Sequence, residues 1–187
     1  MKKQKQPGSI ELICWSMFSG KTEEFIRRVK RAVIAKQKII LFKPKKDDRY
    51  EANHIISHEG RKIESMVVSK TADIVDHLKG KNYDLIGIDE VQFFDQHIVN
   101  LCNKLADDGT RVILAWLDLD YAGKPFGPMP ALMATADEVT KLYAICSKCG
   151  ADGHYSFRMC SSDKQVLVWG TDCYMALCRS CYKEMDE

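Results

Sequence analysis

The chain has 187 residues, of which 28 are basic and 26 acidic, so its net charge is only +2, and 45% of its residues are hydrophobic. This composition supports a folded core and excludes an intrinsically disordered or fibrous protein. The small net charge gives no strong attraction to nucleic acid or to a membrane surface, and the most apolar run, 112–117, is far too short to cross a bilayer. We expect a cytoplasmic protein with one ordinary domain and a small appendage.

Apolar periodicity predicts regular elements along the first half of the chain. In chain order, these are a strand at 10–14, an amphipathic helix at 22–36, a strand at 38–42, a loop at 44–60 and a strand at 61–68. Ser69 is then predicted to cap a short helix in which Ile74, Val75 and Leu78 face inward, and Gly80 ends it.

The second half continues the alternation of strands and helices. The patterns predict a buried strand at 83–88, a helix between Asp95 and Gly109, a strand at 111–117, a loop at 118–130, a short helix at 131–136 and a last strand at 139–145. This order is typical of an α/β fold, in which helices cross over a parallel sheet. From Cys146 onward the segments are short and rich in cysteine, so we divide the chain into domains at 1–145 and 146–187.

A phosphate-binding motif stands between the first strand and the first helix. Ser19-Gly20-Lys21-Thr22 matches the end of the P-loop pattern, in which backbone N–H groups hold phosphates, the lysine reaches them and the hydroxyl binds magnesium. The pattern begins with glycine, and that position here is Trp15, which would be strained at positive φ. The motif predicts a P-loop NTPase-like sheet; the alternative is a helix start that reads Gly-Lys-Thr by chance.

Two adjacent carboxylates follow the buried strand at 83–88. Asp89 has the position of a magnesium partner at the carboxyl end of a strand, where open α/β sheets bind their ligands. Glu90 beside it can take a proton from an attacking hydroxyl, because adjacent carboxylates can divide the two roles. The alternative is that Asp89-Glu90 opens a solvated turn.

The eight cysteines fall into groups by spacing. Cys14 and Cys102 lie on apolar faces of predicted elements, Cys160 and Cys173 stand alone, and the others form two Cys-x-x-Cys pairs, Cys146 with Cys149 and Cys178 with Cys181. Four thiolates in this arrangement predict a closed, structural zinc site and argue against a disulfide framework. A redox pair or buried cysteines without a metal are the competing interpretations.

These motifs together resemble the type II thymidine kinases, the cytosolic family of human and bacterial cells. The resemblance runs from Ile10 to Tyr182 and is carried by Met17 to Thr22, Asp47-Asp48-Arg49-Tyr50, Asp89 to Phe94, Lys124-Pro125-Phe126-Gly127, both cysteine pairs and Tyr174. It implies a P-loop α/β domain with a small C-terminal zinc-binding lasso domain, and ATP- and magnesium-dependent phosphorylation of the 5′-hydroxyl of thymidine. It also suggests a homotetramer or a dimer.

The resemblance also implies roles for single residues. Lys21 would stabilise the phosphates, Thr22 and Asp89 would hold magnesium directly or through water, Arg49 would meet phosphate charge, and Glu90 would be the general base. The expected ATP and magnesium residues are Trp15, Ser16, Met17, Phe18, Ser19, Gly20, Lys21, Thr22, Arg49, Asp89 and Gln92. The expected thymidine residues are Met17, Leu117, Ser156 and Tyr174 in the pocket, Tyr121 and Phe126 as aromatic walls, and Gln165, Val166, Leu167, Val168 and Trp169 in the covering loop.

Three tryptophans depart from the family pattern. Trp15, Trp116 and Trp169 stand where family members commonly carry glycine, or alanine at the second position. One alternative function is therefore a nucleotide-binding or regulatory homologue with weakened catalysis. Another is a zinc-ribbon module for nucleic acid, suggested by the cysteine pairs and the basic residues of 27–31 and 43–46, which are expected to be a solvated surface instead.

Overall fold

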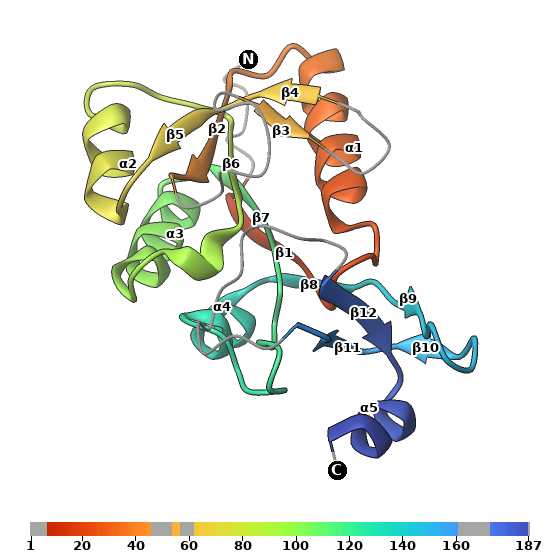
Figure 1. The fold of residues 1–187 in the computed structure, drawn as a ribbon. Helices are drawn as coiled ribbons and strands as arrows, with labels where there is room; N and C mark the ends of the chain where they lie inside the picture. The colour runs from red at the N-terminus through yellow and green to blue at the C-terminus, as the bar shows by residue number, and fades with distance from the viewer. Residues whose placement is uncertain (1–6, 46–53, 57–61, 161–172, 187) are drawn as a thin grey trace.

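The computed structural model describes residues 7–45, 54–56, 62–160 and 173–186, and its centre is a parallel β-sheet (Figure 1). The sheet has six strands in the order β5-β2-β6-β7-β1-β8, and every neighbouring pair is parallel. Its strands are β1 (Ser9–Cys14), β2 (Ile39–Pro44), β5 (Met66–Val68), β6 (Leu85–Asp89), β7 (Arg111–Trp116) and β8 (Glu138–Lys141). The predicted α/β fold is confirmed.

Helices cover both faces of this sheet (Figure 1). They are α1 (Lys21–Ile34), α2 (Thr71–Leu78), α3 (His97–Asp107) and α4 (Met129–Thr135), with a short 3-10 turn, η1 (Val91–Phe93). Side chains of a strand alternate between the two faces, so Ile13 joins the core beneath α1, whereas Leu12 and Cys14 join the core beneath α2, α3 and α4. The carboxyl ends of the parallel strands meet at one edge, which is where the candidate site lies.

Two stretches predicted as continuous strands are each divided into two separate strands. The stretch 61–68 contains β4 (Lys62–Glu64), which pairs antiparallel with β3 (His54–Ile56) outside the main sheet, and β5, which lies inside it. The predicted loop at 44–60 therefore contains a strand. Ile55 and Ile63 pack beneath α1, and this long-range burial is what holds the β3–β4 hairpin together. Likewise 139–145 divides into β8 and β9 (Ala144–Ile145).

The predicted helix boundaries are close to the observed ones, with two differences at α2. Ser69 does not cap this helix; the Asp73 carboxylate instead accepts hydrogen bonds from the backbone N–H groups of Ser69 and Lys70. Val75 is 40% exposed, so only Ile74 of the expected inward side chains is fully buried. Just before α3, the Asp95 carboxylate accepts a hydrogen bond from the N–H of His97 at 2.9 Å.

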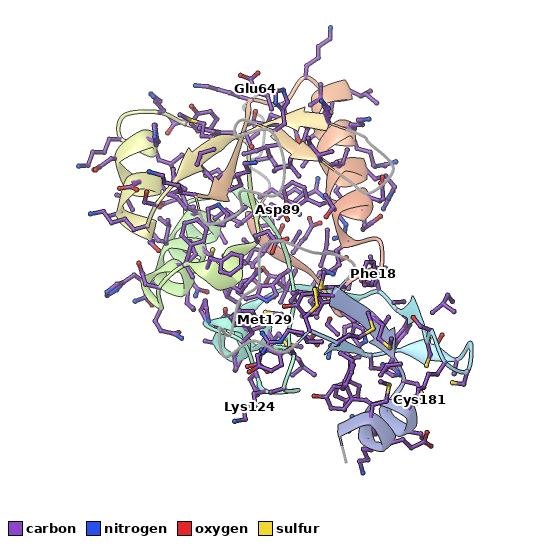
Figure 2. All side chains as sticks on the ribbon, viewed as in Figure 1. Phe18, Glu64, Asp89, Lys124, Met129 and Cys181 are labelled. Carbon is purple, nitrogen blue, oxygen red and sulfur yellow. A yellow bond between two sulfur atoms is a disulfide. The ribbon has the colours of Figure 1, made fainter. Side chains whose placement is uncertain are left out.

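The segment after β8 forms a smaller unit with its own core. It contains β9, β10 (Asp152–Gly153), β11 (Tyr155–Arg158), β12 (Tyr174–Leu177) and α5 (Arg179–Asp186). Cys146, Tyr155, Leu177, Cys181 and Tyr182 form a hydrophobic cluster separate from the two cores of the main sheet. Figure 2 places Cys181 in this C-terminal part, whereas Asp89 lies near the middle of the molecule. Among the described residues, no helix is long and apolar enough to cross a membrane.

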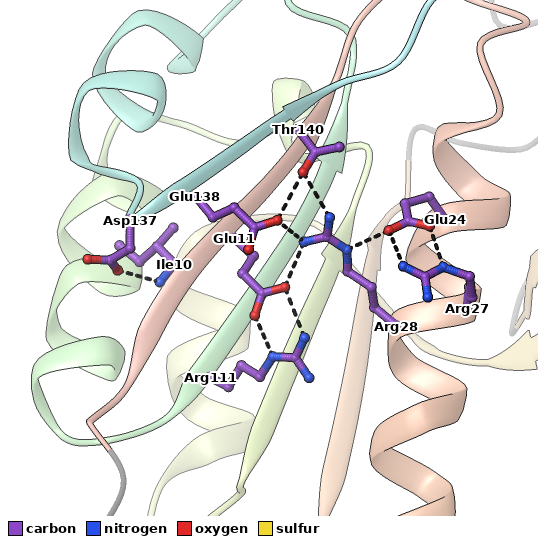
Figure 3. A network of polar contacts seen from close by, with 9 residues as sticks. All are labelled: Ile10, Glu11, Glu24, Arg27, Arg28, Arg111, Asp137, Glu138 and Thr140. Atoms are coloured by element: carbon purple, nitrogen blue, oxygen red, sulfur yellow. Dashed lines mark hydrogen bonds and ion pairs between the residues drawn. The ribbon is translucent and has the colours of Figure 1, made fainter.

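A buried ion network ties the sheet to α1 (Figure 3). Glu11 of β1 lies between Arg28 of α1, at 2.7 Å, and Arg111 of β7, at 2.5 Å, and Arg28 also contacts Glu24 and Glu138. Burial raises the pKa of Glu11, but its hydrogen bonds with the two arginines outweigh burial and leave the pKa below its ordinary value of 4.5. Two of the basic residues expected on the surface of α1, Arg27 and Arg28, are thus paired with acidic side chains.

We expect Glu11→Gln to lower the free energy of unfolding by about 2 kcal/mol at neutral pH, because two arginines lose a charged partner. A group with a lowered folded pKa stabilises the protein above its unfolded pKa, near 4.5, and this contribution is lost as the pH falls through the folded pKa. Urea unfolding at pH 7 and pH 3 measures both effects. Glu138→Gln is the matched control, since Glu138 contacts the same Arg28 but its side chain is 55% exposed. Equal losses in the two variants would contradict this account.

Candidate active site

The phosphate-loop motif has the predicted structural context, because it links the end of β1 to the start of α1. Gly20 has a φ of 81° immediately before the helix, a conformation that glycine adopts without strain. The Lys21 ammonium donates to the Ser16 carbonyl at 2.6 Å and lies 3.4 Å from the Ser19 hydroxyl. The lysine therefore lies against its own loop, close to the backbone that would surround a phosphate, and Thr22 follows in the first turn of α1.

Trp15 and Phe18 hold backbone conformations that are unusual for residues with a side chain. Their φ angles are 130° and 65°, and such conformations cost on the order of 1–3 kcal/mol each. The strain expected for Trp15 at the glycine position is confirmed. Its indole ring packs against Tyr143 and His154, with ring centroids 5.6 and 5.4 Å away, and the Lys141 ammonium lies 4.0 Å above it. The ring therefore contacts residues far along the chain, from the end of β8 onward.

Asp89 and Glu90 lie where β6 ends. Asp89 is the last residue of the strand and is buried, and Glu90 follows it with a φ of 48°, in the left-handed region. In register, Asp89 is level with Ala115 of β7, and Cys14, the residue before the phosphate loop, is level with Trp116. The carboxylates and the loop therefore share one edge of the sheet with β7 between them, about 10 Å apart at the usual strand spacing.

Gln92 connects this carboxylate pair to the next loop. Its amide nitrogen donates to the Glu90 carboxylate, and its amide oxygen is buried with no hydrogen-bond partner among the described residues. A side chain on Gly127 would meet the Gln92 carbonyl at 2.8 Å, so this position requires glycine. The segment 124–127 is thereby packed directly against the segment that carries Glu90. The expected ATP role of Gln92 stays a prediction.

Among the described residues expected around thymidine, one is linked to the phosphate loop and two others lie around Arg158 of β11. The backbone N–H of Met17 donates to the buried Ser156 hydroxyl at 2.9 Å, which links the phosphate loop to β11. The Arg158 guanidinium lies 3.3 Å above the Tyr121 ring, and Arg158 pairs with Tyr174 across β11 and β12.

Two further residues of this group are Phe126, which lies between Phe93 and Asp118, and Leu117, which precedes Asp118 in the chain. The ring of Phe126 meets Phe93 edge-on, with centroids 6.1 Å apart, and its N–H donates to the Asp118 carbonyl. Leu117 is half-buried and packs against the core beneath α3. Arg49 and residues 165–169 lie outside the described residues, so their expected roles stay predictions.

Three polar residues of the site were not singled out from the sequence. Asp118 follows the predicted strand at 111–117 just as Asp89 follows the predicted strand at 83–88, so a sequence signal was available. Asp118 is buried, and burial raises the pKa of its carboxyl against the opposing effect of Lys141 and Lys21. Lys141 ends β8 and lies 4.0 Å from the Asp118 carboxylate. His154 accepts a hydrogen bond from the Trp15 indole at 3.1 Å, a contact across 139 residues that no local pattern predicts.

The four paired cysteines converge on one point in the C-terminal unit. The Sγ atoms of Cys146, Cys149, Cys178 and Cys181 all lie within 4.8 Å of one another, and those of Cys149 and Cys178 are 3.6 Å apart. In a tetrahedral site with zinc–sulfur bonds of the usual length, the sulfur atoms would be about 3.8 Å apart. The predicted cluster is confirmed, and its geometry fits a zinc ion.

The electrostatics of the cluster also suit a cation. Burial opposes ionisation of Cys146, but hydrogen bonds from the N–H groups of Cys178, Cys149 and Lys148 outweigh it and lower its pKa to about 6. The pKa of Cys181 is raised to about 12, first by its hydrogen bond with Cys178 and then by burial. Four thiolates this close together repel one another, and a divalent ion at this point would supply the compensating positive charge.

The expectation that Cys160 and Cys173 stand alone is wrong, because they form a disulfide with Cα atoms 5.3 Å apart. Cys160 follows β11 and Cys173 precedes β12, and the N–H of Met159 donates to the Cys173 carbonyl at 2.8 Å. The antiparallel pairing of β11 and β12 is what brings the two cysteines opposite each other, and their spacing in the sequence does not reveal it.

We expect loss of this disulfide in Cys160→Ser to destabilise the protein by about 2 kcal/mol, because the bond links positions 13 residues apart and limits the unfolded chain. Thermal unfolding of wild type with and without a reducing agent measures the effect. Cys102→Ser is the control, because it removes a buried thiol outside the hairpin. The melting temperature of this variant should still fall when the reducing agent is added. A wild-type melting temperature that is the same with and without the reducing agent would contradict the prediction.

The known proteins that this chain resembles are thymidine kinases. A family model described as thymidine kinase matches residues 8–182. The chain is 50% identical to a thymidine kinase of Bacteroides fragilis (strain YCH46) over 183 residues, 98% of this chain and 91% of that protein. It is 49% identical to that of Bacteroides thetaiotaomicron over 97% of this chain and 90% of the other, and 47% identical to that of Rhodothermus sp. over 94% and 82%. The chain belongs to the thymidine kinase family.

Proposed function

We propose that this protein transfers the γ-phosphoryl group of ATP to the 5′-hydroxyl of thymidine. The observation that carries the proposal is the placement of a P-loop and an adjacent pair of carboxylates at one edge of a parallel sheet, in a chain of this family. Phosphoryl transfer needs positioning and charge neutralisation, and these residues can supply both. Thymidine salvage for DNA synthesis would then be its cellular role, in the cytoplasm.

Each residue has a defined task in this proposal. The backbone N–H groups of the loop and the Lys21 ammonium would hold the phosphates, so Lys21 must leave the Ser16 carbonyl that it contacts here. Thr22 and Asp89 would hold magnesium, directly or through water, and magnesium would neutralise charge on the transferred phosphoryl group. Glu90 would accept the proton of the 5′-hydroxyl, and its contact with Gln92 supports a fixed orientation.

The thymidine side would be formed by the residues that meet the phosphate loop. Met17, Leu117, Ser156 and Tyr174 would surround the base, with Tyr121 and Phe126 as aromatic walls, and 165–169 would cover it. The contact of Met17 with Ser156 supports this proposal because it joins the phosphate loop to β11, the strand that carries Ser156. A site that hydrogen-bonds its base rejects analogues that leave buried groups unpaired.

We also propose the larger organisation of the protein. The C-terminal unit would be a zinc-binding domain from residue 146 onward, supported by its separate core and its cysteine cluster. A homotetramer or dimer is expected from the family resemblance, and sedimentation equilibrium would measure it.

A radiolabelled assay tests the function. Wild type with ATP, magnesium and thymidine should give thymidine 5′-monophosphate, and omission of magnesium or replacement of Lys21 by Met should stop it. Trp15→Gly should be assayed beside wild type. Product from Trp15→Gly alone would favour the weakened homologue, and no product from either would remove the kinase proposal.

A further inference from the structure

Three successive residues of the phosphate loop are bonded to one short segment of the C-terminal unit. The Trp15 indole N–H donates to His154 Nδ1 at 3.1 Å, the Ser16 hydroxyl donates to the Gly153 carbonyl at 3.1 Å, and the Met17 N–H donates to the Ser156 hydroxyl. The partners therefore run from Gly153 to Ser156, on β10, the linking residue and β11. A loop that only bound phosphate would need no such contacts.

Trp15 makes most of the side-chain contact in this connection. Its ring meets Tyr143 edge-on at an interplanar angle of 76° and His154 at 70°, and Tyr143 and His154 also contact each other, with centroids 5.2 Å apart. Lys141 lies over the ring and is within 4.0 Å of Asp118, at the end of β7. A glycine at this position, which the backbone conformation would favour, could make none of these contacts.

The segment that Trp15 holds continues into the proposed nucleoside side. Ser156 lies two residues after His154 and is paired with Ala176 of β12, and Arg158 on the same strand contacts the Tyr121 ring. The phosphate loop and β11 are therefore connected through side chains that are packed and hydrogen-bonded. Packed elements of this kind can couple two ligand sites.

We propose that Trp15 is a positioning residue that couples the nucleotide and nucleoside sides of the site, so that each substrate strengthens the binding of the other. The inference rests on the proposed function, since it takes ATP and thymidine as the two ligands. The coupling is reciprocal by linkage: a nucleotide that raises thymidine affinity by some factor is itself bound more tightly by the same factor when thymidine is present.

Isothermal calorimetry of thymidine binding, with and without a non-hydrolysable ATP analogue and magnesium, measures the coupling. In wild type we expect the analogue to lower the thymidine Kd about fivefold or more. In Trp15→Phe, which keeps an aromatic ring but loses the indole donor, and in His154→Ala, the factor should fall toward one. The Kd without the analogue should stay within about twofold of wild type, and KM for thymidine at saturating ATP should rise by the factor lost.

The controls separate positioning from folding. Trp116→Phe changes a buried core tryptophan that has no part in these contacts and should keep the wild-type factor. Zinc content and circular dichroism show that each variant is folded. The double variant Trp15→Phe, His154→Ala should lose no more coupling than either single variant, because both remove the same bond.

Each other result overturns the inference. A wild-type coupling factor of one in an enzyme that still forms product would remove the coupling and leave the proposed function intact. Equal loss of thymidine affinity with and without the analogue would show that Trp15 only supports the fold. If the losses of coupling in the two single variants add in the double variant, the bond between Trp15 and His154 does not carry the coupling.

Discussion

Glu90→Gln is expected to lower kcat roughly 10²- to 10⁴-fold while the dissociation constants of ATP and thymidine stay within a few fold of wild type. Gln cannot accept the proton of the 5′-hydroxyl, but it keeps the shape of the side chain and its contact with Gln92. Asp89 remains at the end of β6, so the proposed magnesium contact is preserved. A loss confined to kcat is the result that a general base predicts.

Single-turnover kinetics with prebound substrates is the suitable measurement, because it separates the chemical step from product release. Glu64→Gln is the matched control, since Glu64 lies on β4 with its side chain exposed, and its kcat should equal that of wild type. A near-normal chemical rate in Glu90→Gln would exclude Glu90 as the base. Weakened binding of both substrates with an unchanged chemical rate would instead give Glu90 a binding role.

Local sequence patterns predicted the main sheet because its strands and helices carry their own signals. The strand 10–14, the helix 22–36 and the strand 111–117 each match an observed element to within two residues. Their apolar spacing reflects burial on one or both faces, which is a local property of the chain. The buried run before Asp89 likewise ends where β6 ends, so the carboxylate pair could be placed at the sheet edge.

Elements held by distant partners were the ones missed. The β3–β4 hairpin depends on the burial of Ile55 and Ile63 beneath α1, and neither strand has more than three residues. The bond between Cys160 and Cys173 depends on the register of β11 with β12. Local sequence favours a loop at 44–60 and unpaired cysteines at 160 and 173. Tertiary contacts determine the observed strand and the observed disulfide instead.

The candidate site likewise contains features that local sequence predicts and features that depend on distant contacts. The phosphate loop, Asp89-Glu90 and the four paired cysteines are short motifs whose chemistry requires fixed spacing, and the structure brings each of them together as expected. Lys141 and His154 both contact Trp15, and these contacts join residues far apart in the sequence. The departure of Trp15 from glycine was visible in the sequence, but its partners were not, so its effect on the site could not be predicted.

The four-cysteine cluster, with zinc bound as proposed, should be required for activity although it lies outside the reacting groups. The C-terminal unit has a small core, in which Tyr155 stacks on Tyr182 with ring centroids 4.4 Å apart, and small units of this size commonly depend on a metal. The Tyr182 hydroxyl donates to the Tyr121 carbonyl at 2.9 Å, so α5 is joined to the loop after β7. Structural zinc contributes on the order of 10 kcal/mol to folding in small zinc domains.

Cys178→Ala is therefore expected to abolish zinc binding and to lower kcat/KM for thymidine by at least about a hundredfold. With one zinc ligand removed, the C-terminal unit would no longer hold Gly153 and Ser156 against Ser16 and Met17. The phosphate loop would then lose these hydrogen-bond partners. Metal analysis should find one zinc per chain in wild type and none in the variant. Limited proteolysis should cleave the variant after Lys141 while the main sheet stays resistant.

Cys102→Ala is the matched control, because Cys102 is a buried cysteine of α3 outside the cluster and should leave the zinc content unchanged. Its own cost is a small cavity in the core, which lowers stability without changing substrate binding. A Cys178→Ala protein that has lost its zinc but retains wild-type kcat/KM would show that the C-terminal unit folds without metal. Loss of activity with zinc still bound would instead place Cys178 itself, or the start of α5, in contact with substrate. Because the two results differ in zinc content, a single preparation of the variant distinguishes them.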